Sequence, residues 1–133
     1  MDVPIEDNCV LEGTYHDTKR CYEATEELLK RKERPTCIFF PDDFSAMGGI
    51  NAIYDAGLRI PDDISVAGYD GIRLAEVISP QLMTWKQNTE ELGRQASAHL
   101  IELIEHPKTA LIDRYVVSGR LMEGGSVADI TKR

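Results

Sequence analysis

Long hydrophobic runs are missing from the sequence, and so is the cysteine pattern of a disulfide-bonded protein. No apolar stretch approaches the roughly 18 residues that a membrane helix needs. The opening segment, MDVPIEDNC, is acidic and has no apolar core, so we expect no signal peptide if Met1 is the true start. Cys9, Cys21 and Cys37 lie far apart without a CxxC spacing, which favours reduced, mostly buried thiols. These absences predict a cytoplasmic protein without a membrane segment.

Positive charge is also scarce. The 133 residues carry 23 Asp and Glu against 15 Lys and Arg, which gives a formal charge of −8. A chain this acidic repels phosphate backbones, and it contains no basic stripe of the kind that follows nucleic acid. The composition, with 42% hydrophobic and 29% charged residues, is otherwise that of one folded domain. We therefore expect no direct DNA binding by this chain.

Motifs of catalysis and cofactor binding are lacking as well. The sequence contains no GxxxxGK[ST] loop, no strand-coupled GxGxxG and no GxSxG. His16, His99 and His106 do not have the spacing of metal ligands, and no Cys–His pair suggests a nucleophile. We predict a protein that is not an enzyme, with no cofactor and no metal.

Hydrophobic periodicity predicts alternating strands and helices. Short apolar runs indicate strands, and apolar residues at i, i+3, i+4 and i+7 indicate helices. The predicted strands are 9–13, 36–40, 64–70, 82–87 and one or two within 110–127; the predicted helices are 15–34, 44–56 and 88–107. The buried stripe of the last helix is expected to be Leu92, Ala96, His99, Leu100, Leu103 and Ile104. This order favours the α/β class, with a mostly parallel sheet and helices on both faces.

Polar side chains follow successive predicted strands. Asp42 and Asp43 come directly after CIFF, Asp70 after ISVAGY, and Gln87 after LMTWK. Since ligands of such sheets lie beyond the carboxyl ends of the strands, these groups should meet at one edge. Tyr15, just after the first predicted strand, could reach the same edge. Acceptors beside an aromatic ring suit a polyhydroxylated ligand.

Each of these residues also has a structural interpretation. Asp43 stands where a helix N-cap belongs, which leaves Asp42 as the better ligand candidate. Asp70, within GYDG, could simply shape a turn. Gln87 or Tyr15 alone means little. The prediction of a site therefore depends on their convergence.

Several ordered blocks resemble the lactose-repressor (LacI/GalR) family of bacterial transcription regulators. The blocks are DDFSAMG, GLRIPDDISVAGYDG, PQLMTWKQ and LGRQA, and the resemblance runs from about residue 13 to 127. It implies a periplasmic-binding-protein-like (type I) core of two α/β lobes that closes on a sugar or purine effector. A separate helix-turn-helix domain of such regulators binds operator DNA as a homodimer.

The resemblance also implies roles for individual residues. Tyr15 falls where an aromatic ring stacks on the effector, and Asp70 and Gln87 fall at pocket positions. Asp42 stands at a pocket Asn, and Thr89 replaces a frequent aromatic. By position, Asp43 is implied to be structural, and Met47, Val77 and Ile78 correspond to the dimer interface.

Two departures from the family pattern carry expectations. Asp in place of Asn at position 42 could turn two carboxylates towards the ligand, which would favour one rich in donors or positively charged. By length, 1–133 correspond to a partial effector-binding and dimerisation lobe, the C-terminal lobe incomplete at its N-terminal side. The helix-turn-helix, the first lobe and the opening strand and helix of the second are then expected outside this chain. Apolar surfaces exposed by their absence predict dimerisation or strand exchange.

Two other functions remain open from the residues. An exported sugar-binding protein of a transporter shares the two-lobe fold, although the quoted blocks are closer to the repressors. A receiver-like phosphoacceptor domain would use an acid pair, a further aspartate and Lys86. The spacings between these groups are too short for that domain, and the acid pair follows the second predicted strand instead of the first.

Overall fold

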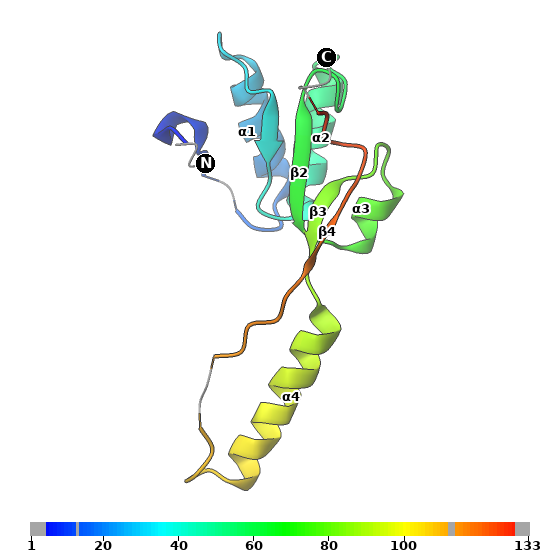
Figure 1. Cartoon of the computed structure of the whole chain (residues 1–133). Coiled ribbons are helices and arrows are strands. Elements are labelled where there is room, and N and C mark those ends of the chain that lie inside the picture. The colour runs from blue at the N-terminus through cyan, green and yellow to red at the C-terminus, as the bar shows by residue number, and fades with distance from the viewer. Residues whose placement is uncertain (1–4, 13, 112–113, 130–133) are drawn as a thin grey trace.

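The computed structural model describes residues 5–12, 14–111 and 114–129 of the chain (Figure 1). A short 3-10 turn is followed by helices that alternate with strands. The elements are η1 (Asp7–Cys9), α1 (Thr18–Leu29), β1 (Cys37–Phe39), α2 (Asp43–Asp55), β2 (Ser65–Asp70), α3 (Arg73–Val77), β3 (Met83–Lys86), α4 (Thr89–Glu105) and β4 (Arg120–Met122). Within these residues no helix combines the length and the apolar character that a membrane crossing requires.

The strands form one four-stranded sheet in the order β1-β2-β3-β4. β1, β2 and β3 run parallel, and β4 pairs antiparallel with β3. The prediction of an α/β fold with a mostly parallel sheet is therefore confirmed. Because the three parallel strands point the same way, their carboxyl ends lie along one edge of the sheet.

Local sequence signals set the helix boundaries. Asp17, Asp42 and Asn88 are the N-caps of α1, α2 and α4, and each side chain accepts a hydrogen bond from a backbone N–H of the first turn. α2 ends at Asp55, and Gly57, just after the C-cap, has a φ of +72°, the left-handed conformation expected after a helix. Its N–H donates to the carbonyl of Tyr54, as the Schellman motif requires.

The core lies on one side of the sheet. α2 packs on β2, and α1 packs against α2. The buried apolar side chains come from α1, α2, the strands and the loops between them. They are Cys21, Ile38, Phe40, Ala46, Ile50, Ile53, Ile64, Val66, Ala75 and Leu82. This packing holds the carboxyl ends of the parallel strands in register.

The prediction of helices on both faces is wrong for the part of the chain described. On the second face, Phe39, Tyr69 and Trp85 are 67%, 39% and 40% exposed. Tyr69 and Trp85 are cross-strand partners, so they lie on the same face. We call this surface the open sheet face. None of the described helices covers it, and α4, which follows β3, extends away from the sheet (Figure 1).

α4 was expected to bury an apolar stripe, but it has no buried residue. It extends away from the sheet, and the chain returns beside it towards β4 (Figure 1). The ring centroids of His99, on α4, and Tyr115, on the returning segment, lie 4.0 Å apart, so the two side chains are in contact. Leu100 and Ile104 remain 59% and 70% exposed. His99 is therefore not a core residue, and the predicted stripe faces solvent.

The strand predicted at 9–13 is also wrong as far as it is described. Residues 7–9 form the turn η1, the segment to residue 12 pairs with no strand, and residue 13 lies outside the described residues. An apolar run needs a neighbouring strand to become part of a sheet, and none lies beside it. Cys9 and Cys37 are exposed and only Cys21 is buried, so the expectation of mostly buried thiols is wrong as well.

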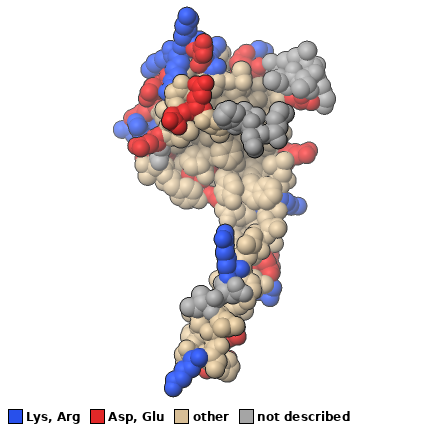
Figure 2. All heavy atoms as spheres, turned by 60° about the vertical axis from the view of Figure 1, so that its left-hand side comes forward, with Lys and Arg blue, Asp and Glu red and all other residues tan. Residues whose placement is uncertain are grey.

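Charges of both signs are mixed on the surface. On the face drawn in Figure 2, basic and acidic side chains cluster together on the body, whereas much of the protruding α4 region carries neither. On α1 they form ion pairs such as Lys30–Glu26 at 3.8 Å and Lys19–Glu23 at 4.0 Å.

Candidate functional site

Asp70 occupies the last position of β2 in a backbone conformation that is rare for its type. Its φ is +107°, and Gly71 follows with φ +69°. A side chain at position 71 would meet the Lys86 Cα at 2.4 Å, so only glycine allows β2 and β3 to approach this closely. Such backbone outliers in non-glycine residues concentrate at functional sites. The turn holds the Asp70 carboxylate at the edge formed by the strand ends.

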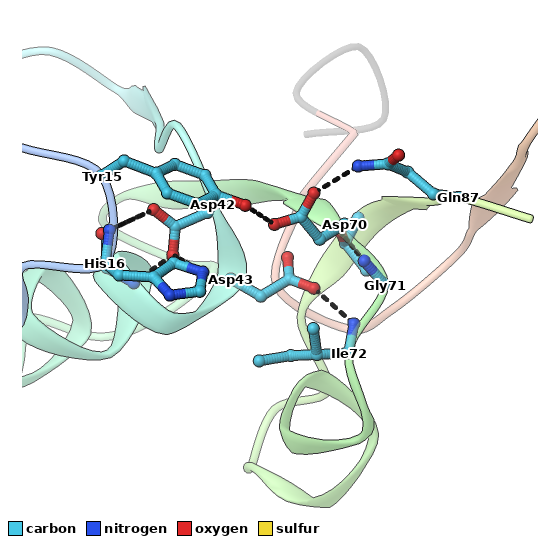
Figure 3. A network of polar contacts seen from close by, with 10 residues as sticks. Tyr15, His16, Asp42, Asp43, Asp70, Gly71, Ile72 and Gln87 are labelled. Atoms are coloured by element: carbon cyan, nitrogen blue, oxygen red, sulfur yellow. Dashed lines mark hydrogen bonds and ion pairs between the residues drawn. The ribbon is translucent and has the colours of Figure 1, made fainter. Parts of the chain in front are cut away.

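Two side chains distant in sequence hold the Asp70 carboxylate. The Tyr15 hydroxyl donates to one oxygen at 2.6 Å, and Gln87 Nε2 donates to the other at 2.5 Å (Figure 3). The hydrogen bond to Asp70, reinforced by its charge, raises the pKa of Tyr15 to about 12. Tyr15 therefore stays protonated and remains a donor at neutral pH. The structure thus brings together Tyr15, Asp70 and Gln87, which we call the rim network.

Asp42 lies beside this network but is fully buried. One oxygen accepts the Ser45 N–H at 2.7 Å; the other accepts the Ser45 hydroxyl at 2.7 Å and the His16 N–H at 3.1 Å. Burial alone would raise the pKa of Asp42, but these hydrogen bonds outweigh it and lower the pKa. The helix-capping role predicted for Asp43 therefore belongs to Asp42. The expectation that two carboxylates face the ligand does not hold in this conformation.

Asp43, the first residue of α2, is structural in a different way. Its carboxylate is buried and accepts the Ile72 N–H at 2.9 Å, which ties α2 to the loop after β2. Among the described residues, no donor reaches the other oxygen with hydrogen-bond geometry. Burial raises the pKa of Asp43, although the Thr84 hydroxyl and nearby amides lie close enough to oppose that effect. Asp43 therefore supports the turn that carries Asp70.

The remaining predicted residues lie outside the rim network. Thr89 is the exposed first residue of α4. Of the residues assigned to a dimer interface, Met47 and Ile78 are partly buried and pack against the core. Val77 is 69% exposed and available to a partner.

Sequence reasoning missed two aromatic residues beside Tyr15. The His16 ring stacks on the Tyr15 ring with centroids 4.2 Å apart and an interplanar angle of 17°. Phe44 also lies near His16, with ring centroids 5.7 Å apart. Nothing in the residue pattern singled out His16, because its place follows from the turn before α1.

A hollow of about 310 Å³ adjoins the rim network where the chain leaves β3 and returns to β4. It is lined by Lys86, Gln87, Asn88, Ser118, Gly119 and Arg120. Gln87 belongs to both the hollow and the rim network. A search of the described residues finds no group of three or more His, Cys, Asp or Glu side chains arranged to hold a metal ion. The arrangement supplies hydrogen-bond acceptors and donors for a small polar ligand.

Comparisons with known proteins agree with this architecture. Residues 5–127 match the family described as periplasmic binding protein-like domain. A curated relative, the HTH-type transcriptional repressor PurR of Photorhabdus laumondii, is 40% identical over 128 residues. That alignment covers 96% of this chain and 37% of the relative, so the chain spans little more than a third of the repressor's length.

Solved structures lead to the same family. A LacI family transcriptional regulator from Arthrobacter sp. FB24, in complex with lactose, matches with TM-score 0.75 and 31% identity, covering 84% of this chain and 42% of that one. A LacI family regulator from Enterococcus faecium with bound ribose matches with TM-score 0.75 and 32% identity, covering 84% and 40%. The chain belongs to the periplasmic-binding-protein-like family, as part of an effector-binding domain of the LacI/GalR type.

Proposed function

We propose that this chain senses a small hydroxyl-rich effector, a sugar or related polyol, on behalf of a bacterial LacI-type transcriptional regulator. The single observation that carries the proposal is the rim network. Tyr15, Asp70 and Gln87 come from three separate parts of the chain and converge on one carboxylate at the strand ends. That is the position where α/β sheets bind ligands.

The rim network is prepared to accept hydroxyl groups. Each Asp70 oxygen accepts one hydrogen bond from the protein and keeps a further lone pair. Two neighbouring hydroxyls of a sugar match such a carboxylate, because both can donate to it. The Gln87 amide oxygen adds an acceptor, and the exposed Tyr15 ring adds an apolar surface. Both features suit the alternating polar and apolar surface of a sugar.

Selectivity follows from the charge at the rim. Asp42 and Asp43 are buried, so Asp70 is the acid of this group with its carboxylate in reach of a ligand. A neutral polyol can donate hydrogen bonds to this single carboxylate. An anionic ligand would instead bring a second negative charge close to Asp70, which costs free energy. The bound lactose and ribose of the two solved relatives support this class of ligand.

The regulatory role rests on the relatives. The curated relatives are named as HTH-type repressors, which favours a regulator over an exported binding protein of a transporter and over an enzyme. We propose that operator DNA is bound through a helix-turn-helix domain outside this chain, and that the intact protein is a cytoplasmic homodimer. Val77, with Met47 and Ile78 beside it, supplies an exposed apolar position for the dimer contact.

Two uncovered apolar surfaces fit a second lobe. The open sheet face and α4 together expose Phe39, Trp85, Leu100 and Ile104. Contiguous apolar surface of this kind marks a contact site. We propose that the rest of the effector-binding domain covers these surfaces in the intact regulator, and that residues 1–133 are a partial effector-binding and dimerisation lobe.

Calorimetry tests the proposed function. The intact regulator, which supplies the rest of the effector-binding domain, is titrated with ribose and with lactose, and the Asp70→Asn variant is compared with Asp55→Asn. Asp55 is a matched control, because it accepts a hydrogen bond from the Tyr22 hydroxyl at 2.9 Å away from the strand ends. We expect Asp70→Asn to weaken binding about 10- to 100-fold, the value of hydrogen bonds to a charged acceptor, and Asp55→Asn to leave it unchanged. Equal effects of both variants, or no binding of either sugar by the intact regulator, would contradict the proposal.

A further inference from the structure

The contact between Tyr15 and His16 is unusual because the two residues are consecutive. In an extended chain, neighbouring side chains point to opposite sides. His16 instead has φ +59°, a left-handed conformation that is uncommon for a residue other than glycine. The turn brings its ring parallel to that of Tyr15, with centroids 4.2 Å apart. Something must hold His16 in this conformation.

Asp42 supplies that constraint. Its Oδ2 accepts the His16 N–H at 3.1 Å, and its Oδ1 lies 3.9 Å from His16 Nε2 (Figure 3). Asp42 itself cannot move freely, because it is buried and bonded to both the N–H and the hydroxyl of Ser45. The backbone and the ring of His16 are therefore both held against the rigid start of α2.

We propose that His16 and Asp42 are positioning residues of the candidate effector site, holding the Tyr15 ring where its hydroxyl reaches Asp70. This inference rests on the proposed function for its consequence, because the site is the one that we assign to the effector. Asp42 acts through His16, and His16 acts through Tyr15. Neither is required to contact the ligand.

The surroundings of the stack favour this role over a simple surface contact. Tyr15 is 57% exposed, so without a neighbour its ring would have more than one accessible orientation. Phe44 at the start of α2 also lies against His16, with its ring tilted by 49°. The charged groups at this point are Asp42, Asp43 and Asp70 on the packed elements and Asp17 on the same loop. The Tyr15 ring is thus held at two points, by stacking on His16 and by the hydrogen bond from its hydroxyl to Asp70.

The first test observes Tyr15 directly, without any effector. The chain is labelled with ¹³C at the tyrosine ring carbon that bears oxygen, and the signal of Tyr15 is assigned with Tyr15→Phe. In His16→Asn the ring is lost, while the N–H to Asp42 and the tolerance for a left-handed backbone are kept. We expect the Tyr15 signal to move towards its position in Asp70→Asn. His16→Phe, which keeps a ring, should shift it less, and an unchanged signal in His16→Asn would overturn the proposal.

The second test asks whether His16 acts through Tyr15, using ribose and lactose as probes. A stacked pair of this kind predicts an affinity loss of about 2- to 10-fold in His16→Asn. In the Tyr15→Phe background, His16→Asn should cause little further loss of affinity, because the hydroxyl through which His16 acts on Asp70 is already absent. Additive losses would instead mean that His16 contacts the ligand or acts independently, and would contradict the proposal. His99→Asn, on α4, is the matched control and should bind as the parent does.

The two tests separate the two proposals. If neither sugar binds the intact regulator, the proposed function fails, while the Tyr15 signal of this chain still decides whether His16 holds the ring. If a sugar binds and the Tyr15 signal is indifferent to His16, the positioning role fails and the proposed function stands.

Discussion

Replacing Asp42 with Asn, the smallest change that removes its charge, gives a demanding test of the buried end of the site. Asn can still cap α2, since its amide oxygen can accept the Ser45 N–H that Asp42 now accepts at 2.7 Å. Its NH₂ group, however, would face two donors, the Ser45 hydroxyl and the His16 N–H. The hydroxyl can rotate and become an acceptor, but the amide of His16 cannot.

The expected cost follows from that stranded donor. Leaving one partly buried N–H without an acceptor costs about 1–3 kcal/mol. With an m-value of about 2 kcal/mol per molar, a loss of about 2 kcal/mol lowers the urea midpoint by about 1 M. Asp17→Asn is the matched control, because Asp17 caps α1 through the Arg20 N–H alone and Asn caps equally well. That control should change stability by less than about 0.5 kcal/mol.

Unfolding in urea, followed by Trp85 fluorescence and by circular dichroism, measures both variants. The pH dependence adds a second reading, since the pKa of Asp42 is lowered in the folded chain. Stabilisation from its charge is present above the unfolded pKa of about 3.9 and is lost as the pH falls through the lower folded value. The gap between parent and Asp42→Asn should therefore narrow in acid. A variant as stable as Asp17→Asn at neutral pH would refute this reasoning.

Further predictions concern the packing beneath the site. A Cβ at Gly48 would lie 1.8 Å from the Thr18 carbonyl oxygen, so Gly48→Ala should lower the free energy of unfolding by about 1–3 kcal/mol, measured in urea. Gly93→Ala is its control: nothing lies within 4 Å of that Cβ, and the change should raise the helix content seen by circular dichroism. The buried Ser126 hydroxyl bonds the backbones of β2 and β3 at 2.6 and 2.8 Å, so Ser126→Ala should cost about 1–3 kcal/mol. The exposed Ser118→Ala should cost less than about 0.5 kcal/mol, and similar values for both serines would contradict the bridging role.

The hydrophobic periodicity of the sequence predicted the strands of the sheet, but it did not predict where α4 would lie. Short apolar runs located β1, β2 and β3, because the strands of a parallel sheet are rich in apolar side chains. The same rule assigned an apolar stripe to α4, yet that stripe faces solvent. A periodic pattern shows that a helix has an apolar face, but it does not say which surface that face will meet.

The two adjacent acids show a similar limit. Either Asp42 or Asp43 could cap α2 by sequence, since a boundary that is uncertain by one residue decides which of them precedes the helix. The structure makes Asp42 the cap and buries both carboxylates. Burial could not be predicted from the residue types, because it depends on His16 and Ile72 folding over the acids from elsewhere in the chain.

The convergence of the rim network was predictable in outline. The rule that parallel strands end at one edge placed Asp70 and Gln87 together, and their side chains are in hydrogen-bond contact. Tyr15 reaches Asp70 although the strand predicted before it is not formed. Its position is set instead by the left-handed turn at His16, a conformation that residue type alone does not reveal.

The most direct measurement of the central claim is the response of the labelled tyrosine rings to whichever of ribose or lactose binds. Tyr15 and Tyr22 each donate to an aspartate, but only Tyr15 lies at the strand ends. We predict that the ligand shifts the Tyr15 signal and leaves the Tyr22 signal in place. A shift of Tyr22, which neighbours the separate hollow between α1 and α2, with Tyr15 unmoved, would contradict it.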